Sequence, residues 1–263
     1  MNRSRSALLG AAALVALTGC STAKTPASSG TTSAGTLTGT LTVFAAASLT
    51  GVFGQLGKEL EADNPGLDVR FNFAGSSQLA TQLTQGAPAD VFASADPAQM
   101  KLVTDASLQA ADPAVFTANV LEIAVPKGNP GHVRGLQDFA DPGLTLAVCA
   151  PDVPCGAAAR KVFAAAKVDA KPDTQEQDVK AALTKVQLGE VDAALVYATD
   201  VRAAGSDVQG IPFPEAGQAV NDYPICALKA APNPSAARAF VALVRSPAGQ
   251  AALAAAGFRT PGS

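Results

Sequence analysis

The most constraining feature of this sequence is a strand–serine–helix unit that occurs twice in succession. The first unit, residues 41–62, is a short apolar run, the segment AAASLT with Ser48, and a helical pattern. The second, residues 68–85, is an extended run, a turn with Ser76-Ser77, and another helical pattern. Consecutive units of this kind place their strands in parallel within one sheet, so that the helix starts meet at one edge. The pattern therefore predicts an α/β fold with two helix starts aimed at one place.

Both serines are predicted at the start of a helix, where serine is a favoured N-cap. The first amide groups of a helix have no partner inside it, and the helix dipole adds partial positive charge there. A hydroxyl beside such amides makes a set of donors suited to an oxyanion. Plain capping is the alternative role for Ser48 and Ser76, and these two serines alone do not decide between them.

The rest of the chain continues the alternation. We expect a helix after Asp96-Pro97 and extended segments at 91–93, 119–125, 144–149, 193–197, 208–213 and 223–229. Further helices are expected at 136–140, 157–168, 179–188, 235–244 and 247–256. The run 119–125 ends in a Pro/Gly-rich loop, which suits a crossing between domains. We predict two α/β lobes with a cleft between them, one of residues 39–119 and 221–263 and one of residues 120–220.

The N-terminus is typical of an export signal. Arg3 and Arg5 form a basic start, and residues 7–17 are an apolar run too short to span a bilayer as a mature helix. The sequence LTGC then resembles the bacterial lipobox, in which cleavage precedes a cysteine that carries lipid. Residues 1–19 are therefore predicted as the signal peptide, Cys20 as the lipid anchor, and residues 20–38 as anchor and flexible tether.

Export predicts an oxidising compartment for the remaining cysteines. Cys149 and Cys155 bracket the loop APDVP and are the predicted disulfide pair. Cys226 lies in the apolar run YPICAL and is expected to be a buried free thiol.

Composition excludes several classes of function. The formal charge is −3, which becomes −5 once Arg3 and Arg5 are removed, and no basic patch indicates nucleic acid as a partner. His132 is the one histidine, so a histidine-rich metal site cannot form. A serine hydrolase with Ser48 as nucleophile is an alternative of a different class. It would need His132 as its base, and that residue lies in a loop-like segment, PKGNPGHVRG.

The chain resembles the periplasmic molybdate-binding proteins of ABC transporters. The segments that carry the resemblance span nearly the whole mature chain in the family's order: TVFAAASLT, FAGSSQLATQLTQGAPADVFASAD, LAVCAPDVPCG, EQDVKAAL, ALVYATD and SPAGQAALAAAGF. GAPADVFASAD and VYATD are specific in combination, whereas AAASLT alone is weak. The resemblance implies the type II periplasmic-binding-protein fold, in which two lobes joined by a two-crossing hinge hold the ligand in the cleft.

The resemblance also implies a ligand set without cationic side chains. By matching segment, the donors are the hydroxyls of Ser48 and Ser76, the backbone amides of Cys155 and Val179, and the phenol of Tyr197. Ser77 competes with Ser76 for its place. Many relatives carry alanine where Cys155 stands, and a Cys149–Cys155 disulfide would brace the loop that carries this amide.

The function that the resemblance implies is capture of molybdate, with tungstate, outside the membrane by a monomeric lipoprotein that delivers it to a membrane permease. The metal enters as an oxyanion, with no cofactor and no directly coordinated metal. A site made only of donors favours a fully deprotonated anion, because a protonated one needs an acceptor for its hydrogen. Sulfate shares the charge of molybdate, so a binding protein for sulfate or another tetrahedral oxyanion is the alternative within the same class.

Overall fold

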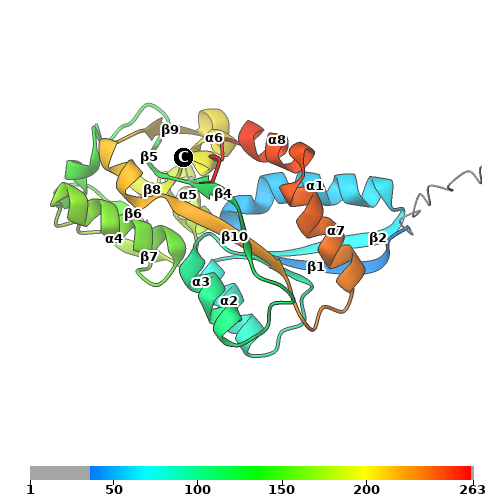
Figure 1. The fold of residues 1–263 in the computed structure, drawn as a ribbon. Helices are drawn as coiled ribbons and strands as arrows, with labels where there is room; N and C mark the ends of the chain where they lie inside the picture. Colours follow the sequence, from blue (N-terminus) through cyan, green and yellow to red (C-terminus); the bar gives the residue numbers. More distant parts are fainter. Residues whose placement is uncertain (1–35, 262–263) are drawn as a thin grey trace, which may run out of the picture. The chain divides into compact units, whose positions relative to one another are not determined.

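The computed structural model describes residues 36–261, and these residues contain two mixed sheets of five strands each. Figure 1 shows the strands with the helices that cover them. The predicted signal peptide, Cys20 and most of the predicted tether lie outside the described residues. Within residues 36–261, no helix is long and apolar enough to cross a membrane.

The first sheet has the order β2-β1-β3-β10-β4. Its strands are β1 (Thr38–Ala46), β2 (Gly66–Ala74), β3 (Val91–Ala93), β4 (Ala114–Asn119) and β10 (Asn221–Ala227). β1 runs parallel to β2 and β3, and Ala45 pairs with both Phe73 and Ala93. The three strands therefore end at one edge, from which the helices after them begin. β10 returns antiparallel to β3 and β4.

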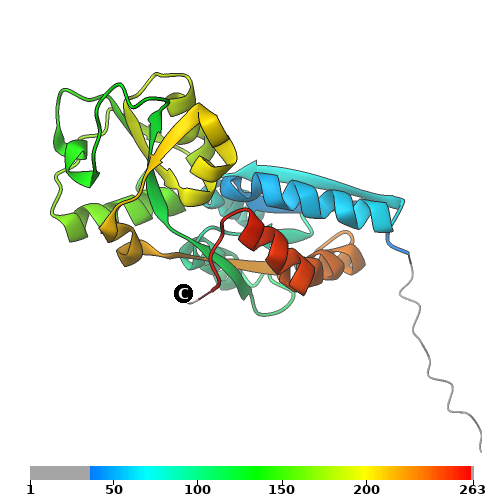
Figure 2. The same cartoon turned by 90° about the horizontal axis from the view of Figure 1, so that it is seen from above.

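Alternation along β1 sends side chains to two separate cores. Leu41, Val43 and Ala45 face one cluster, and Phe44 faces another. The first cluster lies under α1 (Thr50–Asp63), α7 (Pro234–Arg245) and α8 (Pro247–Ala255), and the second under α2 (Ser76–Thr84) and α3 (Pro97–Asp105). Figure 1 shows α1 and α7 on one side of this sheet with α2 and α3 on the other, and Figure 2 shows the first group from above.

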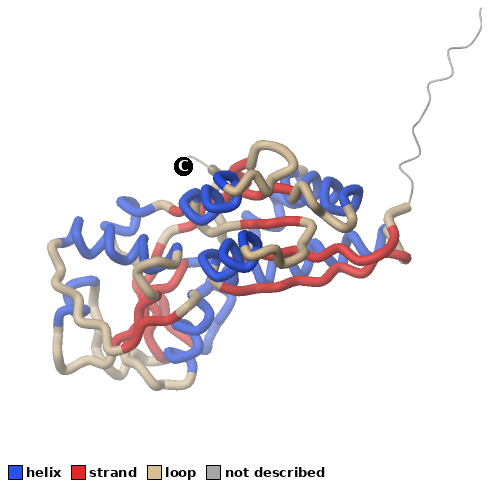
Figure 3. The backbone as a smooth tube through the Cα atoms, turned by 90° about the horizontal axis from the view of Figure 1, so that it is seen from below, coloured by secondary structure: helices blue, strands red, loops and turns tan. Residues whose placement is uncertain are grey.

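The second sheet has the order β7-β6-β8-β5-β9. Its strands are β5 (Leu121–Pro126), β6 (Leu146–Cys149), β7 (Thr174–Glu176), β8 (Ala193–Tyr197) and β9 (Val208–Ile211). Around them lie α4 (Pro154–Ala166), α5 (Val179–Gln187) and α6 (Ala198–Ala204), with 3-10 turns at Leu136–Ala140, Gly205–Asp207 and Pro214–Ala219. Helices flank the strands in both parts of the chain, as the blue and red segments of Figure 3 show.

The predicted strand at 119–125 is observed as β5, shifted to Leu121–Pro126, and the strand before it, β4, was not predicted. β4 ends at Asn119 in the first sheet and β5 begins at Leu121 in the second. The side-chain oxygen of Asn119 accepts a hydrogen bond from the backbone N–H of Val120 at 3.0 Å, so this N–H does not join a sheet. The chain crosses between the sheets here and returns between β9 and β10.

Most other elements follow the sequence prediction. The predicted strands at 91–93 and 193–197 are observed as β3 and β8 with the same bounds. The sequence prediction missed β7, α6 and the 3-10 turn at Pro214–Ala219. Each is short, and α6 follows β8 directly without a breaker residue between them.

Candidate functional site

The five ligand positions expected from the sequence all line one cavity between the two sheets. Ser48 and Ser76 come from elements of the first sheet, and Cys155, Val179 and Tyr197 from elements of the second. The rest of the lining is Ala46, Gly75, Ala95, Val153, Pro154 and Asp178. The structure thus brings together residues that lie up to 149 positions apart in sequence, from Ser48 to Tyr197. Ser77, the competitor of Ser76, is not part of this lining.

Helix starts converge on the cavity. Gly75, Val153 and Asp178 are the N-caps of α2, α4 and α5, and all three line it. The first amide groups of each helix therefore face this region with no acceptor inside their own helix. In α5, the Asp178 carboxylate accepts the amides of Lys180 and Ala181 but not that of Val179. The Val179 amide is therefore not used by this carboxylate.

The predicted N-cap role of the two serines is wrong. Ser48 lies in the middle of a 3-10 turn, Ala47–Leu49, which intervenes between β1 and α1. This turn is held by the hydroxyl of Thr50, which donates to the Ala47 carbonyl at 2.7 Å. Ser76 is the first residue of α2, and Gly75 is the N-cap. Neither serine hydroxyl caps a helix. Each has a different hydrogen-bond partner.

The hydroxyl of Ser76 has its acceptor side occupied. Its oxygen accepts a hydrogen bond from the backbone N–H of Ala95 at 3.0 Å, and the residue is buried. A backbone N–H can only donate, so the hydroxyl proton of Ser76 must point elsewhere. Because Ser76 lines the cavity, this proton is available to an acceptor placed there.

The hydroxyls of Ser48 and Tyr197 also belong to a buried network. The Ser48 hydroxyl lies 2.9 Å from that of Tyr223, and the Tyr197 oxygen accepts from the side-chain amide of Asn221 at 3.0 Å. The rings of Tyr197 and Tyr223 pack edge to face, with centroids 6.1 Å apart. Burial raises the pKa of both phenols, so both stay protonated donors at neutral pH.

The predicted disulfide between Cys149 and Cys155 is confirmed. Cys149 ends β6 and Cys155 is the second residue of α4, so the bond ties this helix start to its strand. The next residue, Gly156, packs closely on this turn, since a side chain there would collide with the Ala150 carbonyl. Cys226 is free and buried, as expected, and burial raises its pKa to about 12.

One ion pair lies behind the site. The Asp200 carboxylate is fully buried, accepts the Tyr197 backbone N–H at 3.2 Å and pairs with Lys180 at 2.9 Å. Burial raises the pKa of Asp200, and the Lys180 ammonium partly offsets this. The pair uses the charge of Lys180, so this cation is not free to neutralise a ligand.

The cavity is small and has no cationic side chain. Its volume is about 10 Å³, and none of the residues that line it is lysine or arginine. The described residues contain no cluster of three or more His, Cys, Asp or Glu side chains that could hold a metal ion. The donors that remain are neutral hydroxyls and amides, which can surround an oxyanion as they do at other helix starts.

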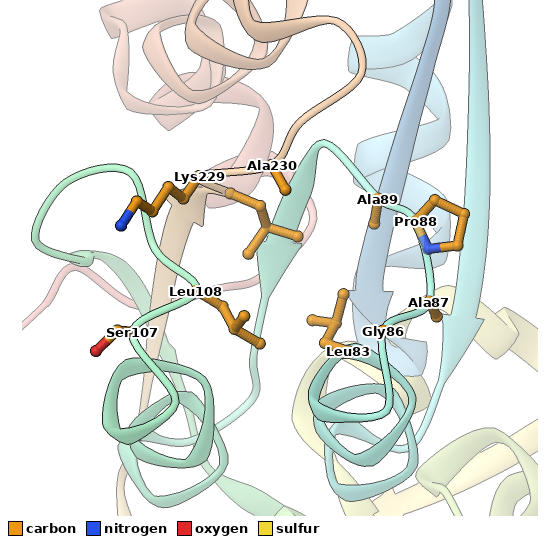
Figure 4. A pocket seen from close by; sticks show the side chains of 10 residues that line it. Leu83, Gly86, Ala87, Pro88, Ala89, Ser107, Leu108, Lys229 and Ala230 are labelled. Atoms are coloured by element: carbon orange, nitrogen blue, oxygen red, sulfur yellow. The ribbon is translucent and has the colours of Figure 1, made fainter.

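A larger pocket elsewhere has different chemistry. Its volume is about 430 Å³, and it lies beside the loops that follow α2, α3 and β10. Figure 4 shows aliphatic side chains such as Leu83 and Leu108 at its wall, with Lys229 at the rim. It lacks converging polar donors and is not the candidate site.

Sequence reasoning missed three residues that support the site: Ala95, Asn221 and Tyr223. Asn221 and Tyr223 lie on β10, which reaches the site only because the chain crosses back into the first sheet. The one available signal was a tyrosine and an asparagine beside an apolar strand, and that pattern is common in ordinary cores.

The fold and the site define a two-lobed solute-binding protein, in which a small ligand is held between two α/β units. The family comparison agrees. Residues 41–259 match the model of the bacterial extracellular solute-binding proteins, and the chain belongs to that family.

Curated relatives and solved structures are similar over most of the chain. The molybdate-binding protein ModA of Mycobacterium tuberculosis is 47% identical over 221 residues, which are 84% of this chain and 85% of the relative. The periplasmic molybdate-binding protein of Azotobacter vinelandii superposes with a TM-score of 0.72 at 20% identity, covering 84% of this chain and 99% of that one. The sulfate-binding protein SubI of Mycobacterium tuberculosis gives a TM-score of 0.70 at 18% identity, covering 85% and 87%. These two structures support the fold alone.

Proposed function

We propose that this protein captures molybdate, together with tungstate, and delivers it to an ABC importer. The observation that carries the proposal is the lining of the cavity, where Ser48, Ser76, Cys155, Val179 and Tyr197 supply hydroxyls and amides and no cation. The 47% identity to a molybdate-binding protein supports the same ligand. Such a lining has donors for every oxygen of a tetrahedral dianion.

We assign the residues as the sequence predicted. The hydroxyls of Ser48, Ser76 and Tyr197 and the backbone amides of Cys155 and Val179 donate to the anion. The supporting geometry is that Ser76 and Tyr197 each accept a hydrogen bond from the protein and so turn their protons outward. The protein acts by binding, and no chemical step is assigned to it.

The two lobes are assigned to residues 39–119 with 221–263 and to residues 120–220. The support is that the strands of each sheet fall within one of these sets, with crossings after Asn119 and before Asn221. Rotation about the two crossings would open and close the cavity, as in other hinge-type binding proteins. The closed form is the one that a permease would recognise.

The protein is further proposed to be exported, cleaved before Cys20 and anchored by lipid on that residue as a monomer. The basic start, the short apolar run and LTGC support this assignment. Palmitate labelling of cells that express the protein tests it, since Cys20→Ala should abolish the label.

Isothermal titration of the purified mature protein with molybdate, tungstate, sulfate and phosphate tests the ligand. We expect tight binding of the first two and weaker binding of the others. If sulfate competes with molybdate at similar concentration, the protein is a general oxyanion carrier and the molybdate assignment is wrong.

A serine hydrolase receives no support from the geometry. His132 is exposed in the loop after β5 and does not line the cavity, and the Ser48 hydroxyl faces Tyr223 instead. A general base must lie within hydrogen-bond reach of its nucleophile. The solute-binding family to which the chain belongs is in general not enzymatic.

A further inference from the structure

We propose that Asn221 is a specificity-determining residue, because it fixes Tyr197 as a donor toward the cavity and thereby excludes protonated oxyanions. Asn221 does not line the cavity but lies directly behind it, as the first residue of β10. It is 7% exposed, so its side chain has few partners other than those of the protein. The inference rests on the proposed function, and it assigns a role to a residue that is not one of the five ligand positions.

The orientation of the Asn221 amide follows from its partners. Its nitrogen lies 2.8 Å from the carbonyl oxygen of Ala95 and 3.0 Å from the phenol oxygen of Tyr197. A carbonyl can only accept, so the nitrogen end of the amide must face Ala95. The second hydrogen of the same nitrogen is then directed at Tyr197, whose oxygen is the acceptor.

The proton of Tyr197 is therefore turned away from Asn221. Two acceptors remain near it, the hydroxyl of Tyr223 and an anion in the cavity that Tyr197 lines. A charged oxygen is the stronger acceptor of the two. With an anion in the cavity, the phenol donates to it and cannot accept from it.

The Ala95 backbone couples this arrangement to the opposite wall. Its carbonyl holds Asn221, and its N–H donates to the hydroxyl of Ser76. One peptide residue thus sets the direction of two hydroxyls, one on each sheet. Both present protons to the cavity, so neither hydroxyl is an acceptor for the P–O–H group of hydrogen phosphate or hydrogen arsenate.

The test is the variant Asn221→Asp, which has the same shape and replaces the donor by a carboxyl group. Burial favours the neutral acid, and its O–H oxygen then stands where the Asn221 nitrogen stood, so it can donate to Ala95 and accept the proton of Tyr197 with a lone pair. Tyr197 would then offer a lone pair to the cavity. We expect the Kd for molybdate to rise about tenfold or more, and the affinity ratio of molybdate over phosphate to fall at least tenfold.

Two controls separate this effect from added charge and from general damage. Asn72→Asp makes the same change at a residue of β2 whose side-chain amide donates a hydrogen bond to Gln82. It should leave the affinity ratio of molybdate over phosphate unchanged. In the Tyr197→Phe background, Asn221→Asp should no longer alter the ratio, since the hydroxyl that it redirects is gone. Thermal unfolding of each variant reports whether the fold is kept.

The outcomes distinguish the inference from the function beneath it. If wild type does not bind molybdate, the proposed function fails and the inference fails with it. If wild type binds molybdate and folded Asn221→Asp keeps the wild-type ratio of molybdate over phosphate affinity, the proposed role of Asn221 is wrong and the proposed function stands. Should Asn221→Asp not fold, Asn221→Ala decides in its place, because it also frees the Tyr197 lone pair and must lower the ratio.

Discussion

Gly75 and Gln177 directly follow strands of different sheets, β2 and β7, yet the Gln177 carbonyl oxygen occupies the space where a side chain on Gly75 would begin. No real Cβ atom comes as close to an oxygen as one added here would. The backbone of Gly75 has φ −59° and ψ 135°, which any residue adopts. Glycine is therefore required at this position by the approach of the two sheets, not by the conformation of the chain.

Gly75→Ala should weaken ligand binding without destabilising the fold. Alanine fits the local backbone, but its methyl group prevents the two sheets from approaching as they do here. We expect the molybdate Kd to rise tenfold or more, from an overpacking cost of about 1–3 kcal/mol. The free energy of unfolding without ligand should change by less than about 0.5 kcal/mol.

Calorimetry and urea unfolding measure the two effects separately. Gly54→Ala in α1 is the matched control, because a Cβ there meets nothing within 4 Å. It should bind molybdate as wild type does. Equal binding by Gly75→Ala would show that the approach of Gly75 to Gln177 is not needed for the ligand-bound state.

Reduction of the Cys149–Cys155 disulfide should lower both stability and affinity. The bond joins residues six positions apart, and a loop of this length contributes about 2 kcal/mol by restricting the unfolded chain. It also holds the start of α4, where the Cys155 amide lines the cavity. Dithiothreitol should therefore reduce the urea midpoint and weaken molybdate binding.

The double variant Cys149→Ala/Cys155→Ala provides the control for the reductant. It should resemble reduced wild type and show no response to dithiothreitol, since Cys226 is free in either case. A reductant effect that persists in the double variant would place the sensitivity elsewhere.

The sequence predicted the ligand positions more completely than the interactions behind them. Ser76 and Val179 are the first residues of α2 and α5, as the expected helix starts indicated, and Cys155 is the second residue of α4. Their role as ligands came from the resemblance and stays a prediction. The 3-10 turn at Ser48 was missed, since three residues carry no periodicity. The role of Asn221 depends on pairing across 126 residues with Ala95, and a local pattern contains no information about such a contact.

Tyr223→Phe should weaken molybdate binding although Tyr223 does not line the cavity. Its hydroxyl is the partner of Ser48 at 2.9 Å, and its removal leaves that serine free to turn away from the cavity. The lost hydrogen bond is worth about 1 kcal/mol, so we expect an increase of about fivefold in Kd. Calorimetry measures it, and combination with Ser48→Ala should add nothing further, because both changes act on the same hydroxyl.

Asp200 should make the stability of the protein depend on pH in the direction opposite to most carboxylates. Its pKa in the folded state is raised above the ordinary value of 3.8, chiefly by burial. The folded state therefore holds this proton more tightly than the unfolded state does. The stabilising contribution is fully present below pH 3.8 and is lost as the pH rises through the raised pKa.

The variant Asp200→Asn isolates this contribution. Its side-chain oxygen can still accept the Tyr197 N–H, and the group no longer titrates. Urea unfolding from pH 4 to pH 7 should show wild type losing stability relative to Asp200→Asn as the pH rises. Asp207→Asn, at an exposed position, should show no such trend. If wild type instead gains stability relative to Asp200→Asn as the pH rises, the pair with Lys180 outweighs the cost of burying the carboxylate.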